Sequence, residues 1–121
     1  MNTLDLLLSN KTIEYPTTEI KINILSQEIG KDVIFKIRAF SIDRLEEVRK
    51  NNTSDFAIHA ILESVVEPNL KDKALMDKYN CYTPVDMVKK LLLAGEVEEL
   101  YFNIKKLSGF TGDTVSEIKK K

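Results

Sequence analysis

Two stretches near the amino terminus alternate apolar and polar residues, the pattern of strands with one buried face. Isoleucine occupies positions 20, 22 and 24, and a second alternating run extends from Val33 to Ala39. Between them, Ser26–Asp32 contains Gly30, which suits a left-handed turn. We predict an antiparallel β-hairpin at about residues 19–40. Because an isolated hairpin is marginally stable in water, its apolar face must pack on helices.

The apolar spacing becomes helical after Ala39. We expect Ser41 to cap a helix whose buried side carries Ile42, Leu45 and Val48. A short helix is also predicted before the hairpin, over Leu4–Leu8, where the run is too short for periodicity to distinguish helix from strand.

Two more helices are predicted in the middle of the chain. The first covers about Asp55–Val66 and ends before Pro68, because a proline disfavours helical geometry in the residue before it. The second covers Leu70–Tyr79, with Asn69 as its cap and Asn80 as a left-handed stop.

The stretch from Thr83 to Phe110 carries its own start and stop signals for two helices. Thr83 is a suitable N-cap and Pro84 suits the first helical position. We interpret Gly95 as the joint between the two helices, and Gly109 as the left-handed stop of the second. The predicted fold class is therefore α+β, mostly α, with the amino-terminal hairpin packed on a bundle of about five short helices.

The length of 121 residues is typical of one domain. We expect a single domain over residues 1–121, with the hairpin at 19–40, a helical part at 41–110 and a polar, frayed tail at 111–121. Apolar residues make up 43% of the chain and charged residues 31%, a balance that excludes a disordered protein.

Charge and composition exclude several classes of partner. The 18 basic and 19 acidic residues leave a net charge of −1, which offers no electrostatic attraction to nucleic acid or an anionic membrane. No apolar run approaches the ~20 residues that cross a bilayer. Cys81 is the only cysteine, so an internal disulfide is impossible and a reducing, cytoplasmic location is expected.

The chain offers few groups for catalysis or metal binding. His59 is the only histidine, and helical spacing would align it with Asp55 and Glu63. Such a row could hold a divalent ion, but zinc sites usually need three or four ligands and the chain has no further His or paired Cys, so we interpret the row as a solvated helix face. Cys81 has no base in a supporting motif, and no glycine-rich phosphate loop occurs. We predict no enzyme, no cofactor and no metal.

Two helices joined by a glycine can also suggest a DNA-binding helix-turn-helix. The charges oppose that interpretation, because the second helix would begin with Glu96, Glu98 and Glu99 and would repel phosphates.

A few apolar side chains are predicted on otherwise polar faces. These are Ile34 in the hairpin, Leu93 near the predicted joint and Phe102 in the last helix. The hairpin should also present two edges able to accept a strand. Together these features favour a protein that binds other proteins, with Ile34, Leu93 and Phe102 as the candidate contacts.

The order of several short motifs resembles the tail assembly chaperones of tailed phages, especially those encoded before the tape measure protein in Gram-positive prophages. The motifs are Pro68-Asn69-Leu70-Lys71-Asp72, Tyr79-Asn80, Thr83-Pro84, Leu91-Leu92, Gly95-Glu96-Val97, Leu100 and Leu107-Ser108-Gly109-Phe110. The positions shared with the family pattern are Pro68, Leu70, Thr83, Pro84, Gly95, Gly109 and Phe110. Caps, turns and packing explain these residues, so we assign none of them to a binding site.

The resemblance implies a non-catalytic viral protein of the bacterial host cytoplasm. Such chaperones bind the tape measure protein and bring tail tube subunits to it, then leave the finished particle. Self-association stays open. The alternative is a prophage structural adaptor, or another protein-interaction module, that is retained in the tail.

Overall fold

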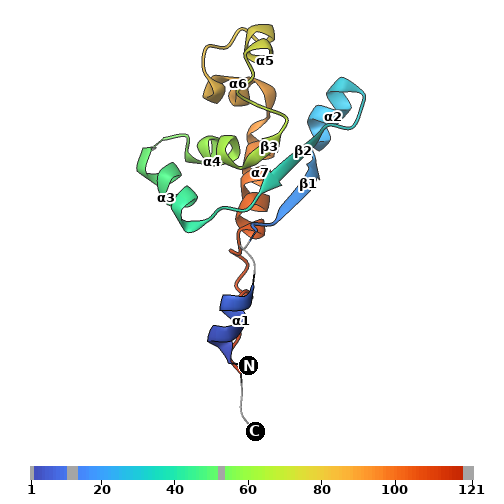
Figure 1. The fold of residues 1–121 in the computed structure, drawn as a ribbon. Helices are drawn as coiled ribbons and strands as arrows, with labels where there is room; N and C mark the ends of the chain where they lie inside the picture. The colour runs from blue at the N-terminus through green and yellow to red at the C-terminus, as the bar shows by residue number, and fades with distance from the viewer. Residues whose placement is uncertain (1, 11–13, 52–53, 119–121) are drawn as a thin grey trace.

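A computed structural model describes residues 2–10, 14–51 and 54–118 of the chain. Helices predominate over a small sheet within these ranges (Figure 1), which confirms the predicted α+β class. In chain order the elements are α1 (Thr3–Ser9), β1 (Thr17–Lys21), α2 (Asn23–Ile29), β2 (Ile34–Arg38), α3 (Ile42–Asn51), α4 (Phe56–Ser64), β3 (Val65–Glu67), α5 (Lys73–Lys78), α6 (Pro84–Leu91) and α7 (Ala94–Leu107).

The predicted hairpin pairing is present as an antiparallel β1–β2 ladder, running in register from Thr17 opposite Arg38 to Lys21 opposite Ile34. The connection between the strands differs from the prediction. The strand expected to continue through Ile24 ends at Lys21, and the expected turn is the helix α2.

Side-chain hydrogen bonds explain why the chain turns helical at this point. The Ser26 hydroxyl donates to the Ile22 carbonyl over 2.6 Å and accepts from the Val33 amide over 2.8 Å. It therefore ties α2 to the start of β2. Gly30 does end α2 in the left-handed region, at φ 89°, as its position predicted.

A third strand, β3, pairs with β2 and was not predicted. The helix expected to reach Val66 ends at Ser64, whose hydroxyl donates to the Arg38 carbonyl over 2.8 Å. From there the β-branched Val65 pairs with Ile37 of β2. The part predicted as purely helical therefore contains a strand, and one of the two hairpin edges expected to be free is covered.

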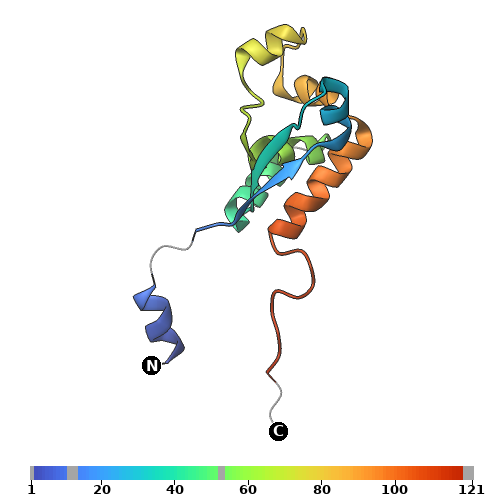
Figure 2. The same cartoon turned by 90° about the vertical axis from the view of Figure 1, so that its right-hand side faces the viewer.

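The sheet has one buried and one open face. Phe35 and Ile37 are buried against a core that includes Ile61 of α4 and Leu100 and Ile104 of α7. In Figure 2 the sheet lies beside α7, with β1 on the side nearer that helix. The opposite face carries exposed side chains, mostly charged, from alternate positions of β1 and β2.

The buried side of α3 is narrower than predicted. Ser41 does cap the helix, since its hydroxyl accepts the Arg44 amide over 3.2 Å, and Val48 is buried with Leu45 partly so. Ile42, however, is 78% exposed. Because α3 packs mainly on α4, its first residue projects beyond that contact into solvent.

The helix predicted over Leu70–Tyr79 is shorter. It begins after Asp72, whose carboxylate accepts the Leu75 amide over 3.1 Å. Asn69 instead accepts the Lys71 amide over 3.0 Å and forms a turn before the helix. The left-handed conformation predicted for Asn80 is confirmed, at φ 56°.

Most of the local signals around α6 and α7 act as predicted. The Thr83 hydroxyl accepts the Asp86 amide over 3.1 Å, and Pro84 opens α6. At the far end, Gly109 is left-handed at φ 96°. The Phe110 amide donates to the Lys105 carbonyl over 3.0 Å, which closes the C-terminal motif that such a glycine permits.

The joint between these helices is not at Gly95. Leu92 and Leu93 form it in an extended conformation, and Gly95 lies in the first turn of α7 without a positive φ. A glycine is therefore not required there, because α6 ends by a change in ψ that any residue tolerates.

The predicted tail beyond α7 forms no helix or strand over the part that the structure describes, up to residue 118, and Lys119–Lys121 lie outside it. None of the helices in the described ranges is both long and apolar enough to span a lipid bilayer.

Candidate protein-binding surface

The three apolar positions predicted to contact partners are all exposed. Ile34, opposite Lys21 in the ladder, is 42% exposed, Leu93 at the joint between α6 and α7 is 55% exposed, and Phe102 on α7 is 64% exposed. They do not converge on one site. Ile34 is on the open face of the sheet, whereas Phe102 is on the solvent-facing side of α7, away from the buried Leu100 and the core.

Leu93 borders a recess in the described part of the chain. It lines a groove of about 330 Å³ between the end of β1, the start of α2 and the amino-terminal half of α7. The apolar lining comes from Ile20, Ile22, Ile24, Leu93 and Leu100, and the polar lining includes Lys21, Asn23, Glu99 and Asn103. Neither Ile34 nor Phe102 is among the lining residues. We refer to this recess as the β1–α7 groove.

A buried carboxylate, Glu96, holds the walls of the β1–α7 groove together. One of its oxygens, Oε2, accepts the Leu25 amide in the first turn of α2 over 3.2 Å. The other, Oε1, accepts the Leu93 amide at the start of α7 over 3.0 Å. Ile22, the N-cap of α2, offers no side-chain acceptor, so Glu96 supplies that cap from 71 residues away.

Sequence reasoning missed this role. The sequence predicts only that Glu96 is one of three glutamates near the start of the last helix, where they would repel phosphate. The signal that could have found it is the pairing of a helix start lacking a capping residue, at Ile22, with a glutamate in the third position of a later helix, a position typical of capping interactions.

The charge of the β1–α7 groove is weakly negative. Lys21 forms an ion pair with Asp32 over 3.1 Å, and Glu96 is occupied by two amides. Glu99 is exposed, and no salt bridge to it occurs within the described ranges. The groove is therefore suited to an apolar side chain with a hydrogen-bond donor or a cation beside it.

The row predicted around His59 is held by ion pairs to neighbouring helices. Asp55 pairs with Lys89 of α6 over 3.2 Å, and Glu63 pairs with Arg44 of α3 over 3.2 Å. Both carboxylates thus have cationic partners rather than an open coordination shell. Among residues 2–10, 14–51 and 54–118, no three His, Cys, Asp or Glu side chains are grouped as a metal site requires.

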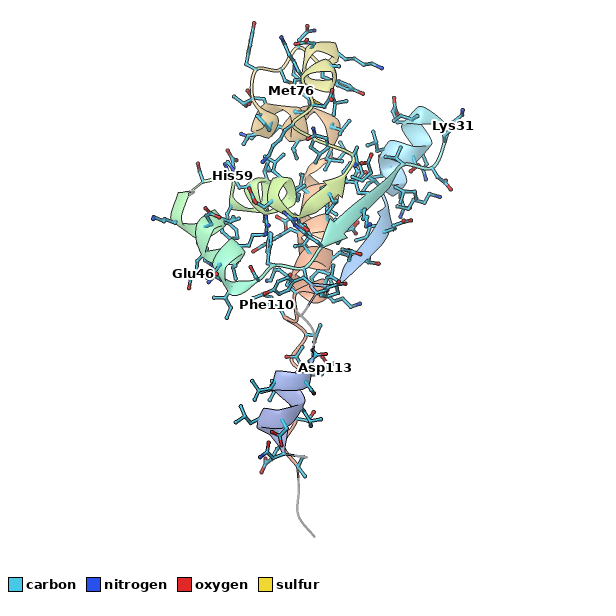
Figure 3. The ribbon with its side chains drawn as sticks, in the orientation of Figure 1. Lys31, Glu46, His59, Met76, Phe110 and Asp113 are labelled. Carbon is cyan, nitrogen blue, oxygen red and sulfur yellow. The ribbon has the colours of Figure 1, made fainter. Side chains whose placement is uncertain are left out.

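His59 lines a cavity of about 400 Å³ between α3, α4 and α6, together with Glu47 and Glu63 (Figure 3 labels His59 on α4). Cys81 is not among its lining residues. The Cys81 side chain is buried and its thiol donates to the Tyr79 carbonyl over 3.4 Å. Cys81 therefore packs as a small side chain, as expected, and the cavity does not bring its thiol to the histidine.

The residues of the family pattern serve the fold. Leu70 is buried, Thr83 and Pro84 start α6, and Gly109 ends α7. Phe110 lies at the end of α7 opposite to the β1–α7 groove (Figure 3). Pro68 follows β3, and Gly95 alone of these positions lines the groove.

Exposed leucines on α1 form a second apolar feature, which was not predicted. They are Leu4, Leu6, Leu7 and Leu8. No residue of α1 is buried, and Figures 1 and 2 both show the helix apart from the sheet and the other helices. The sequence signal for this apolar feature is the unbroken run Leu6–Leu8, since a helix fully surrounded by water has no use for three consecutive leucines.

Comparison with known proteins gives a family for the carboxyl-terminal half. A family model described as the phage XkdN-like tail assembly chaperone protein matches residues 52–119. This range is more than half of the chain and contains α4 to α7.

A relative of similar length matches nearly the whole chain. The sequence is 26% identical to the uncharacterized protein YqbN of Bacillus subtilis (strain 168), over 91% of this chain and 86% of YqbN. The structure is similar to a crystal structure of the protein YqbN, with a TM-score of 0.68 over 91% of this chain and 98% of that one. The likeness therefore includes the amino-terminal sheet as well as the helices.

Proposed function

The chain belongs to the phage XkdN-like tail assembly chaperone family, and from this membership we propose that it binds the tape measure protein of its phage and recruits tail tube subunits to it. A role in phage tail assembly follows from the family itself. The observation that carries the proposal is the family match over residues 52–119. We place this work in the cytoplasm of the bacterial host, where the tail is assembled, and assign it no catalytic step.

The surface supports a binding role of this kind. An aggregation-prone client exposes apolar segments, and this chain offers the β1–α7 groove, α1 and Phe102 as exposed apolar contacts. Its formal net charge of −1 leaves selection to shape and apolar contact rather than to long-range attraction.

Co-expression tests the first half of the proposal. The tape measure protein from the same tail gene cluster would be produced in bacteria with and without this chain, and its soluble fraction measured. We expect several-fold more soluble tape measure protein in the presence of the chain, and a stable complex on affinity purification. An unrelated small α+β protein serves as the control. Equal solubility with both would contradict the proposal.

Mass spectrometry of purified phage particles separates a chaperone from the alternative, a structural adaptor retained in the tail. A chaperone leaves the finished tail, so its peptides should be far below the level of the tube protein. A stoichiometric amount in mature tails would contradict the chaperone role and support the adaptor. Addition of purified tube protein to the preformed complex tests recruitment, with co-elution as the expected result.

A further inference from the structure

We propose that the free edge of β1 accepts an extended segment of the tape measure protein as an added strand, with an apolar side chain of that segment held between Ile24 and Leu93 in the β1–α7 groove. The identity of the client rests on the proposed function. We infer the docking surface from the position of the groove. We infer the extended conformation of the bound segment from the outward backbone groups of β1.

Two backbone hydrogen bonds show which groups of β1 are occupied by β2. The Ile22 amide donates to the Val33 carbonyl over 2.9 Å, and the Ala39 amide donates to the Pro16 carbonyl over 2.9 Å. Both bonds use an even-numbered residue on the β1 side. In an antiparallel ladder the hydrogen-bonded pairs recur at every second residue, so the even-numbered residues of β1 face β2.

The amides and carbonyls of Thr17, Glu19 and Lys21 therefore face away from β2. β1 is an edge of the sheet, and no hydrogen bond within the described ranges reaches these six groups. Donors and acceptors alternate along this edge from Thr17 to Lys21, and the backbone of an extended segment presents the matching pattern. A helix cannot pair with the edge, because its backbone groups are already bonded within the helix.

The β1–α7 groove lies on the side of the sheet where an added strand would need contacts. Ile20 is paired with the buried Phe35, so its side chain is on the inner face of the sheet. Ile20 also lines the groove, opposite Leu100 and Asn103 of α7. Figure 2 shows β1 next to α7 along this side. The inward side chains of a strand added at β1 would thus enter the groove, with Ile24 and Leu93 exposed to receive one of them.

A second copy of the chain fits this edge less well. Glu19 is the central residue of the five in β1, so symmetric antiparallel pairing of two β1 edges over their full length would put Glu19 opposite Glu19. Like charges directly opposite each other destabilise a ladder. The exposed Glu99 adds a further negative charge beside the groove. Both carboxylates favour a client segment in which a lysine or arginine neighbours the apolar residue.

Proline substitution tests the use of the β1 backbone. Glu19→Pro removes one outward amide and puts the proline ring on the edge, where proline is tolerated because no ladder hydrogen bond is lost. We expect it to weaken binding of the tape measure fragment by at least about tenfold, since the bond is lost and the ring blocks approach. Glu19→Thr, which removes the same carboxylate but keeps the amide, should bind several-fold more tightly than Glu19→Pro.

The groove is tested separately at Leu93. Leu93→Ser removes an exposed apolar side chain and introduces a better capping residue at the start of α7, so folding should be preserved. We expect about a tenfold loss of affinity for the fragment. Ile42→Ser is the control, because it removes an exposed apolar side chain of α3 outside the groove and should leave affinity unchanged.

Hydrogen exchange of the full chain, alone and with the tape measure fragment, completes the test. The expected result is slower exchange of the Thr17, Glu19 and Lys21 amides on binding. If the unmodified chain does not bind the fragment, both this inference and the proposed function fail. If it binds, and Glu19→Pro and Leu93→Ser bind equally well, strand addition alone is overturned. Protection of these amides by the chain itself, in a concentration-dependent oligomer, would assign the edge to a second copy and also overturn it.

Discussion

Two short helices, α6 and α2, begin by different means. At α6 the Thr83 hydroxyl caps an amide three residues away in sequence, over 3.1 Å. At α2 the cap is the Glu96 carboxylate, bound to the Leu25 amide over 3.2 Å from the other end of the chain. The start of α6 is therefore determined by its own sequence. In α2, by contrast, the Leu25 amide of the first turn gains its hydrogen-bond partner only when α7 is in place. Local signals located α6, whereas for the residues of α2 they predicted the end of a strand and a turn.

This difference also relates structure to the proposed binding surface. The helix with a distant cap forms one wall of the β1–α7 groove, and its cap forms part of the opposite wall. A groove whose walls are joined by one carboxylate depends on tertiary contacts for its shape. The locally capped α6 and the C-terminal end of α7 contribute stability to the domain rather than groove lining.

Phe35→Ala should have the largest effect on the free energy of unfolding, because it destabilises the core that both α2 and α6 depend on. Phe35 is buried between the sheet and α7, and such a truncation typically costs about 3–5 kcal/mol of the free energy of unfolding. In a single domain, strand amides and helical ellipticity would be lost at the same urea concentration. Ile34→Ala, on the open face, should cost less than about 1 kcal/mol. Helices surviving the loss of the sheet would contradict the predicted single domain.

Glu96→Ala isolates the distant cap. Removing a carboxylate that accepts two amides should cost about 2 kcal/mol, and amide exchange in α2 should quicken while that of α6 stays slow. Urea unfolding and hydrogen exchange measure the two effects. The control is Glu98→Ala, at the same end of α7 but exposed, which should change stability by no more than about 0.5 kcal/mol. Unchanged exchange at Leu25 would remove Glu96 from its assigned role.

Thr83→Ala tests the local cap and should cost about 1 kcal/mol, a typical value for an N-cap. The loss should quicken exchange at the start of α6 and leave α2 unaffected, because the two caps share no atoms. Thr83→Ser keeps the hydroxyl and should restore stability to within a few tenths of a kcal/mol. An equal effect of Thr83→Ala on both helices would show that their starts are coupled.

Gly95→Ala should have the smallest effect and the opposite sign. Gly95 is in the first turn of α7 without a positive φ, and nothing lies within 4 Å of an added Cβ. Alanine should therefore raise the free energy of unfolding by about 0.5 kcal/mol. Gly109→Ala, at φ 96°, should instead lower it by about 1 kcal/mol. Destabilisation by Gly95→Ala would restore the interpretation of Gly95 as the joint.

Periodicity and capping residues located most helices because those signals act within one or two turns. They were wrong where the deciding partner was distant. Ile24 continues an alternating pattern but lies in α2, since Ser26 and Glu96 satisfy helical backbone groups there. Val65 continues a helical stripe but lies in β3, since β2 offers it an unpaired edge.

The candidate surface shows the same limit. Exposure of Ile34, Leu93 and Phe102 was predictable, because the sequence pattern puts each of them on an otherwise polar face. Which of them borders a recess was not, because the β1–α7 groove arises from packing between residues about 70 positions apart.

The sequence by itself determined the α+β class, the β1–β2 pairing, the caps at Ser41 and Thr83 and the left-handed stops at Gly30, Asn80 and Gly109. These follow from hydrogen bonds and backbone preferences that act over a few residues. Only the tertiary structure decided that α2 replaces the hairpin turn, that β3 covers one edge, and that β1 keeps a free edge beside the groove. Those outcomes depend on which distant group forms a hydrogen bond with an unpaired backbone group, and the local sequence pattern does not specify that partner.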